Sequence, residues 1–172
     1  MNYRLKGLAP LLRAVALMPR NRPFRLAVVG HPKYGAYERL AHRLGITNRV
    51  VFLGHRDDPR DAYFASDFLV HPTFYDPCSL VALEALACGL PVITTRYNGA
   101  SELLSPPTDG VVIDDPHNAM SLAGAMTSML DHPYRASAAQ AARQLANRWT
   151  FEHHYRAMLD AFSEVQRIKR AA

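Results

Sequence analysis

Two carboxylates, Asp76 and Glu84, stand eight residues apart across the start of a nearly all-apolar stretch that is predicted to be a helix. A glutamate is almost never fully buried without a partner. The helix start beside Asp76 offers free backbone N–H groups and a positive dipole end, which favour an anion. Eight residues of helix rise about 12 Å. A ligand with hydroxyls at both ends and phosphates between them, such as a nucleotide-sugar, would satisfy all three features.

Asp76 has two interpretations that follow from the residues around it. The simpler one is that Asp76 caps the helix and Pro77 occupies the first helical position. In the functional one, the N–H groups of Cys78, Ser79 and Leu80 hold a diphosphate or the adjoining sugar. Asp76 would then accept hydrogen bonds from sugar hydroxyls. The two interpretations are compatible if Asp76 lies just outside the helix.

Glu84 is surrounded in sequence by apolar residues from Leu80 to Ala87, so we expect it to be buried. A buried carboxylate needs hydrogen-bond donors, because otherwise its pKa rises. The two adjacent hydroxyls of a ribose would provide a bidentate partner. The alternative is a salt bridge to an arginine or lysine elsewhere in the sheet.

Several positions outside this stretch are predicted to contact the same ligand. Lys6 would place a point charge on a diphosphate, with Arg4 assisting, although an ordinary surface lysine is the simpler interpretation. Gly54-His55-Arg56 follows a predicted strand and would line a base pocket, or else form a plain strand-to-helix turn. His71, at another strand end, is either a core histidine or a neighbour of the sugar.

The composition indicates a globular chain, since 49% of its 172 residues are hydrophobic and 20% are charged. We expect no membrane span and no signal peptide. Cys78 and Cys88 fit reduced packing residues of a cytosolic protein. No Asp-x-Asp pair or nucleophile motif stands out, so we expect the chemistry to need no metal and no cofactor beyond the substrate.

The formal net charge of +5 is concentrated in two arginine-rich stretches, residues 13–25 and 167–170. A solvated surface is the simplest explanation. Docking on an anionic membrane face or a phosphorylated glycolipid is the alternative. We do not expect nucleic-acid binding, because no recognition motif accompanies the charge.

Helical and strand patterns alternate along the chain. Repeated units of this length predict an α/β fold, a Rossmann-like doubly wound parallel sheet followed by C-terminal helices. In such sheets ligands bind beyond the carboxyl ends of the strands. The predicted strands are 25–30, 49–53, 68–71, 91–95 and 110–113, and the predicted helices are 5–18, 34–44, 58–66, the stretch from Asp76 to near Gly89, 99–104, 116–131, 134–147 and 150–168.

The order and spacing of these motifs resemble those of family 4 glycosyltransferases, which are retaining enzymes with two Rossmann-like domains, the GT-B fold. The resemblance runs along essentially the whole chain and covers the C-terminal, donor-binding half of that fold. Within the family the chain resembles lipopolysaccharide-core glucosyltransferases and related cell-envelope enzymes. The matching motifs are Lys6-Gly7, Gly30, Val51–Gly54, Ser66-Asp67, His71–Thr73, Asp76-Pro77, Glu84-Ala85, Cys88–Val92, Asn98-Gly99, Glu102-Leu103 and Gly110.

The resemblance implies a role for each of the three residues that we take as catalytic candidates. Glu84 would hold the ribose, Lys6 the diphosphate, and Asp76, with the backbone of Cys78–Leu80, the sugar. The family pattern has a glutamate where Asp76 stands and often a glycine where Ser79 stands. Both differences lie at the sugar-facing end, so they leave the donor sugar open and nucleotide binding intact.

The resemblance also implies that an N-terminal domain binds the acceptor and that transfer occurs in the cleft between the two domains. We expect residues 1–172 to bind an NDP-sugar, with a UDP-sugar as the first choice, but to transfer little sugar without the acceptor domain, which is absent from them. The complete enzyme would move a hexose to a saccharide or lipid-linked acceptor in the cytoplasm, with peripheral contact to the inner face of the membrane. A nucleotide-sugar epimerase-like domain and a non-catalytic nucleotide-binding module are the alternatives.

Overall fold

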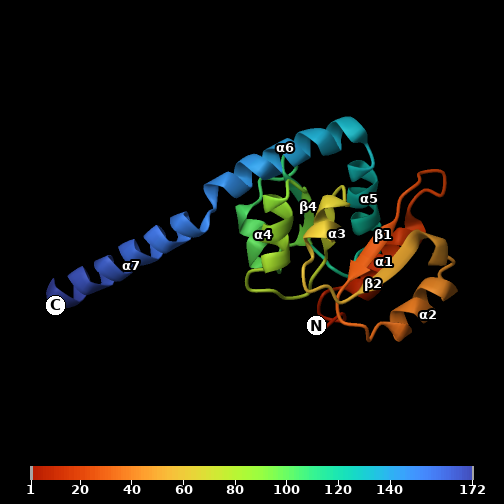
Figure 1. Ribbon diagram of the computed structural model, residues 1–172, viewed down its shortest axis with the longest axis horizontal. Coiled ribbons are helices and arrows are strands. Elements are labelled where there is room, and N and C mark those ends of the chain that lie inside the picture. Colours follow the sequence, from red (N-terminus) through yellow and green to blue (C-terminus); the bar gives the residue numbers. More distant parts are fainter. Residues whose placement is uncertain (1, 172) are drawn as a thin grey trace.

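The computed structural model describes residues 2–171, in which helices and strands alternate as predicted. Figure 1 shows the helices packed around short strands, with the C-terminal helix extending away from the body. The strands are β1 (Leu26–Val29), β2 (Val50–Gly54), β3 (Leu69–His71), β4 (Val92–Thr95) and β5 (Gly110–Ile113). The helices are α1 (Leu8–Leu17), α2 (Gly35–Arg43), α3 (Arg60–Phe64), α4 (Leu80–Ala87), α5 (Ala119–Met129), α6 (His132–Arg148) and α7 (Phe151–Ala171), with short 3-10 helices at Thr47–Arg49 and Gly99–Leu103.

The strands pair in parallel and form two sheets. β1 pairs with β2, and β3, β4 and β5 form a three-stranded sheet in that order. The Rossmann-like α/β prediction is confirmed, with one difference from a single continuous sheet: β1 and β3 are not paired with each other. The pairing of distant strands depends on contacts that local periodicity does not report, so the sequence did not indicate this division.

The first residues of the chain join the carboxyl ends of the two sheets. The Tyr3 hydroxyl donates a hydrogen bond of 2.5 Å to the carbonyl of His31, which follows β1. The Phe74 N–H, which follows β3, donates one of 2.8 Å to the Leu5 carbonyl. The carboxyl ends of both sheets therefore meet at one edge of the molecule, where ligands of parallel α/β folds bind.

The β3–β4–β5 sheet is covered by helices on both faces, as predicted. Successive side chains of a strand point to opposite faces. Val92 and Ile93 of β4 are both fully buried, at 0% exposure, and they belong to different hydrophobic clusters. Ile93 packs in the cluster that includes α1 and α5, whereas Val92 packs in the cluster that includes α4 and α6.

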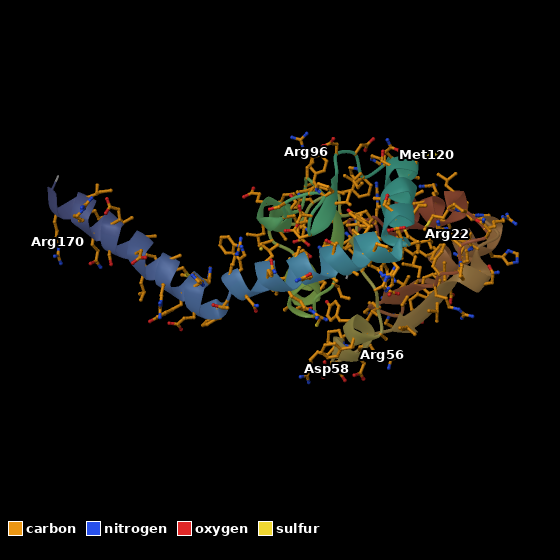
Figure 2. The ribbon with its side chains drawn as sticks, turned by 90° about the horizontal axis from the view of Figure 1, so that it is seen from above. Arg22, Arg56, Asp58, Arg96, Met120 and Arg170 are labelled. Atoms are coloured by element: carbon orange, nitrogen blue, oxygen red, sulfur yellow. The ribbon has the colours of Figure 1, made fainter. Side chains whose placement is uncertain are left out.

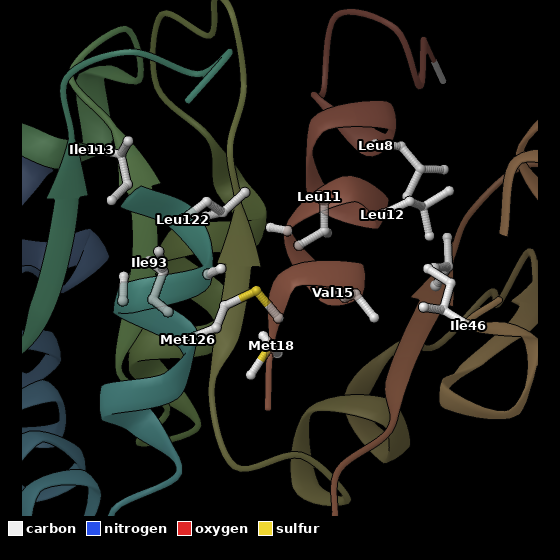
Figure 3. Close-up of a cluster of buried hydrophobic side chains, with 14 of the residues drawn as sticks. Leu8, Leu11, Leu12, Val15, Met18, Ile46, Ile93, Ile113, Leu122 and Met126 are labelled. Carbon is white, nitrogen blue, oxygen red and sulfur yellow. The ribbon is translucent and has the colours of Figure 1, made fainter. Parts of the chain in front are cut away.

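α1 packs against α5 on one side and against Ile46 on the other. Figure 3 shows Leu11 pointing toward α5 and its Leu122, while Leu12 and Val15 point toward Ile46. Burial of a leucine or valine side chain stabilises a fold by roughly 1.5–3 kcal/mol. This packing fixes the start of α1 firmly, and Lys6 lies in the turn that directly precedes α1.

α7 corresponds to the helix predicted over 150–168 and reaches Ala171. It extends from the end of α6 away from the rest of the chain (Figure 1). The apolar face that the sequence predicted is present but exposed, because Phe151 is 84% and Phe162 is 58% exposed.

Candidate functional site

Lys6, His71 and Asp76 form one polar cluster just beyond the carboxyl end of β3. Lys6 Nζ lies 2.5 Å from Asp76 Oδ2, and His71 Nε2 lies 3.4 Å from the same oxygen. The side chains of His71 and Asp76 are 11% and 12% exposed, and that of Lys6 is 29% exposed. The structure thus brings two of the three catalytic candidates, Lys6 and Asp76, into direct contact.

The surroundings of this cluster shift two pKa values. Burial acts to raise the pKa of the Asp76 carboxyl, but the hydrogen bonds and charges of Lys6 and His71 outweigh it and hold that pKa below its usual value. Burial lowers the pKa of His71, and the Lys6 charge adds to this effect against the opposing hydrogen bond to Asp76. Near neutral pH the cluster therefore contains an Asp76–Lys6 ion pair beside a neutral imidazole.

Gly7 allows Lys6 to approach β3 this closely. Its φ of 72° lies in the left-handed region that favours glycine, and it ends the turn that precedes α1. A Cβ atom at this position would lie 2.0 Å from the Pro72 carbonyl oxygen. Only a glycine therefore fits between Lys6 and the backbone that follows β3.

Three buried threonines fix the backbone around the cluster through hydrogen bonds from their hydroxyls to main-chain carbonyls. The Thr73 hydroxyl donates to the Leu5 carbonyl at 3.0 Å, which ties the chain start to the end of β3. The Thr94 hydroxyl donates to the His71 carbonyl at 2.9 Å, and the Thr95 hydroxyl donates to the Thr73 carbonyl at 2.6 Å. All three threonines are 0% exposed, so these bonds are shielded from water and fix the backbone that carries His71.

Asn98 connects this support to the start of α4. Its side chain is 0% exposed, and its Oδ1 accepts hydrogen bonds from the N–H groups of Ser79 at 3.2 Å and Ala100 at 3.1 Å. Its Nδ2 donates to the Thr94 hydroxyl at 3.0 Å. The Asn98 side chain therefore helps to hold the loops after β3 and β4 together.

The Asp76 backbone is fixed by the same loop after β4. The Asp76 N–H donates to the Tyr97 carbonyl at 3.0 Å, and the Gly99 N–H donates to the Asp76 carbonyl at 2.8 Å. A Cβ atom on Gly99 would lie 1.8 Å from the Pro77 carbonyl oxygen. The close approach of Gly99 to Pro77 thus positions the carboxylate of Asp76.

The structure corrects the expected start of the helix after Asp76. α4 begins at Leu80 with Ser79 as its N-cap, so Asp76 lies outside the helix and the capping interpretation is wrong. The reason is that Asn98 and Gly99 hold residues 76–79 in extended or turn conformations. The Ser79 N–H is already bonded to Asn98, whereas the Cys78 and Leu80 N–H groups have no hydrogen-bond partner within residues 2–171. These two are the groups that an anion could use.

Glu84 differs from its prediction, because it is exposed rather than buried. Only one face of α4 is buried, and it consists of Ala82, Ala85 and Leu86. The apolar composition of the helix therefore did not imply burial on every side. In the part of the chain that the structure describes, no arginine or lysine forms an ion pair with Glu84.

The partner of Glu84 is Tyr63 of α3, whose hydroxyl donates to Glu84 Oε2 at 2.7 Å. Burial, and then this hydrogen bond, raise the pKa of Tyr63 above its usual value. Tyr63 was not singled out in the sequence. Tyr63 reaches Glu84 only because α3 lies beside α4, and a contact between two helices cannot be predicted from the local sequence pattern.

The remaining predicted residues are not joined to the cluster. Arg4 is exposed, and so are the side chains of His55 and Arg56 in Gly54-His55-Arg56. Figure 2 shows Arg56 and Asp58 next to α3 at the outer surface of the body. Among the described residues, no hydrogen bond or ion pair links Arg4 or this turn to Lys6 or Asp76.

The described residues contain no group of three or more His, Cys, Asp and Glu side chains that could hold a metal ion. The expectation that the reaction needs no metal therefore stays a prediction. None of the helices within residues 2–171 combines the length and the apolar character that crossing a bilayer requires.

Comparison with known proteins decides which family carries this arrangement. Residues 2–145 match the family model described as "Glycosyl transferases group 1". The chain belongs to this family. The resemblance that the sequence motifs indicated is confirmed, and the chain is a glycosyltransferase family domain.

Two curated relatives illustrate the match. The lipopolysaccharide glucosyltransferase WaaG of Escherichia coli K12 is 32% identical over 149 residues, which are 85% of this chain and 40% of WaaG. The D-inositol 3-phosphate glycosyltransferase of Rhodococcus opacus is 34% identical over an alignment of 171 positions, which covers 92% of this chain and 38% of that protein. The chain therefore spans about two fifths of the length of these relatives.

Two solved proteins share the fold of this chain. The crystal structure of WaaG superposes with a TM-score of 0.80 at 31% identity and covers 86% of this chain and 41% of that one. HepE of Anabaena in complex with UDP-glucose gives a TM-score of 0.80 at 28% identity, with 94% of this chain and 46% of HepE covered. HepE has also been solved in complex with UDP.

Proposed function

We propose that this chain is the donor-binding C-terminal domain of a retaining GT-B glycosyltransferase that uses a UDP-sugar. The observation that carries the proposal is the Lys6–Asp76 pair beyond the carboxyl end of β3, on the loop that leads into α4, the helix that carries the exposed carboxylate of Glu84. Two solved complexes of a relative with UDP and with UDP-glucose support the choice of nucleotide. The complete protein would move a hexose to a saccharide or lipid-linked acceptor.

In this proposal Lys6 and the start of α4 neutralise the diphosphate. The ammonium of Lys6 is partly exposed and is paired with Asp76 on the loop that leads into α4, so a diphosphate oxygen can share it with Asp76. The free N–H groups of Cys78 and Leu80 would add hydrogen bonds at the positive end of the helix dipole. Charge-assisted bonds of this kind are about twice as strong as neutral ones.

Glu84 would bind the two hydroxyls of the ribose. Its carboxylate is exposed and has one oxygen, Oε2, bonded to the Tyr63 hydroxyl, so accepting capacity remains for a ligand. A carboxylate with two oxygens suits a pair of adjacent hydroxyls. Tyr63 would orient Glu84 for this contact.

Asp76 would accept hydrogen bonds from the donor sugar. Lys6 and His71 keep its carboxylate ionised, and an ionised carboxylate is an acceptor on both oxygens. Because an aspartate is one methylene shorter than the glutamate of the family pattern, the sugar would sit closer to the Asp76 backbone, on the loop that follows β3.

Calorimetric titration with UDP, GDP and UDP-glucose tests this function. We expect the Glu84→Gln variant to bind UDP about tenfold more weakly or worse, since a hydrogen bond to a charged group contributes roughly 1.5–3 kcal/mol. Glu38→Gln is the matched control, because Glu38 is an exposed glutamate of α2. If the Glu84 variant binds UDP as tightly as the unchanged chain, the assignment is wrong.

We further propose that residues 1–172 bind the donor without transferring sugar, because the acceptor would bind another domain of the complete protein. Incubation of this chain with UDP-glucose and a glycolipid acceptor should release little UDP. Sustained sugar transfer by this chain alone would contradict the proposal that donor and acceptor bind to two different domains.

A further inference from the structure

A second polar feature lies at the edge of the molecule opposite the Lys6–Asp76 cluster. A depression of about 440 Å³ is formed by the loop before β1 and the turn before β2. β1 and β2 are parallel and pair from Leu26 and Val50 onward, so the depression lies at the amino ends of both strands. The cluster lies beyond the carboxyl ends, and the two features are therefore separate.

Four arginines line this depression, and no acidic residue does. They are Arg20, Arg22, Arg25 and Arg49, and we call the feature the arginine pocket. Figure 2 shows Arg22 at the end of the body that lies away from α7. Within the described residues, none of the four arginines forms an ion pair with a carboxylate.

The sequence explains why these charges have no counterpart. Residues 1–56 contain eleven of the chain's 20 lysines and arginines but one of its 15 aspartates and glutamates, Glu38. The rest of the chain is therefore net acidic, and the positive charge is gathered on the half that contains β1 and β2. Such an uneven field attracts anionic ligands.

Arg49 gives the pocket a fixed wall. Its guanidinium donates hydrogen bonds to the carbonyls of Pro19 at 2.8 Å and Met18 at 3.3 Å. It also lies 4.9 Å from the centroid of the Phe24 ring. These contacts hold Arg49 in place and leave its charge without an anionic partner, while Arg20, Arg22 and Arg25 surround it on one short loop.

We propose that the arginine pocket binds a phosphate-bearing ligand, at a site distinct from the donor site. Guanidinium groups match phosphate oxygens with paired hydrogen bonds, and several arginines together favour a ligand with more than one negative charge. The volume of the depression lies within the ~300–1,000 Å³ that is common for ligand pockets. The ligand is either a soluble diphosphate or the phosphomonoester headgroup of a lipid.

Calorimetry with inorganic pyrophosphate tests the site, using the Lys6→Ala variant as background so that the donor site contributes less to the measured binding. We expect Arg20→Gln/Arg22→Gln to bind pyrophosphate at least about tenfold more weakly. The matched control is Arg13→Gln/Arg39→Gln, which removes the same charge from exposed positions of the same half outside the pocket. In the unchanged chain, the guanidinium NMR signals of Arg22 and Arg49 should shift on addition of pyrophosphate, which gives a second test that needs no variant.

Sedimentation with vesicles separates the two sources of phosphate. Phosphatidylcholine vesicles with phosphatidic acid are compared with phosphatidylcholine alone. Binding to the former that the pocket variant loses identifies a lipid headgroup, and pyrophosphate binding without vesicle binding identifies a soluble ligand. The proposal is overturned if neither probe binds, or if both variant pairs weaken binding equally, because the second result would mean a diffuse basic surface without a site.

Discussion

Lys6 Nζ and Asp76 Oδ2 lie 2.5 Å apart although 70 residues separate them in the chain. The contact depends on Gly7, which lets the start of α1 approach Pro72, and on the loop after β4, which fixes the Asp76 backbone. The pair is only partly exposed, so each charge is the other's main partner until a ligand arrives. A diphosphate would have to share Lys6 with Asp76, and this competition links the diphosphate part of the proposed donor site to its sugar part.

Replacing Lys6 by alanine should weaken UDP binding by about tenfold or more, because a charge-assisted hydrogen bond to the diphosphate is lost and Asp76 is left to repel it. Binding of uridine, which has no phosphate, should change little. Lys33→Ala is the control, since Lys33 is an exposed lysine in the same half of the chain. Calorimetry with both ligands measures the difference, and an equal effect on uridine would point to unfolding instead of a lost phosphate contact.

The lowered pKa of His71 predicts how the stability of the folded chain depends on pH. Because this pKa is lower in the folded chain than its ordinary value of about 6.5, the unfolded chain takes up a proton that the folded chain resists. The contribution of His71 to stability is therefore complete above about pH 6.5 and is lost as the pH falls through the folded-state pKa. The lowered pKa of Asp76 acts in the same direction at lower pH, below about pH 4.

We expect the free energy of unfolding to fall between about pH 7.5 and pH 5.5, and to fall less in His71→Gln than in the unchanged chain. Urea unfolding at the two pH values measures this. His42→Gln is the control, because His42 is exposed on α2. Parallel pH profiles for the His71 variant and the unchanged chain would show that the buried imidazole is not the group responsible.

The order of helices and strands could be predicted because it depends on local periodicity and on glycines such as Gly45 and Gly89 at helix ends. The family motifs likewise placed Lys6 and Asp76 in one site. The predictions that were wrong concern features that depend on packing between elements distant in the sequence. Glu84 was predicted to be buried, but α3 leaves that face of α4 open and supplies Tyr63 as its partner.

The boundary of α4 could not be predicted for a similar reason. Asp76 and Pro77 have the residue types of a helix start, and only the contacts of Asn98 and Gly99 from the next loop delay the helix to Leu80. In the sequence, Asn98 stood out as part of the Asn98-Gly99 motif of the family. Its buried role between two loops is visible only once β3 and β4 are paired.

Gly99→Ala should destabilise the chain by roughly 1–3 kcal/mol, because the added methyl group would lie 1.8 Å from the Pro77 carbonyl oxygen and must displace the loop that carries Asp76. UDP binding should weaken as well. Gly124→Ala provides the opposite case: Gly124 is exposed within α5 and a Cβ there meets nothing within 4 Å. That change should stabilise the chain by roughly 0.5–1 kcal/mol, as measured by urea unfolding.

Equal destabilisation by both glycine changes would contradict the close contact between Gly99 and Pro77. Loss of stability in Gly99→Ala with unchanged UDP affinity would separate the loop from the proposed donor site. The two readouts therefore test the packing and the function of this loop independently.

Leu122 and Phe162 give a final pair, because both are large apolar side chains but they differ in burial, at 1% and 58% exposure. Leu122→Ala removes contacts between α5 and α1 and should cost about 2–5 kcal/mol. Phe162→Ala should change the free energy of unfolding by less than about 0.5 kcal/mol, since α7 does not pack on the body. Urea unfolding at low protein concentration measures both. A large loss in the Phe162 variant would mean that α7 folds back onto the body in solution, which the exposure of its apolar face argues against.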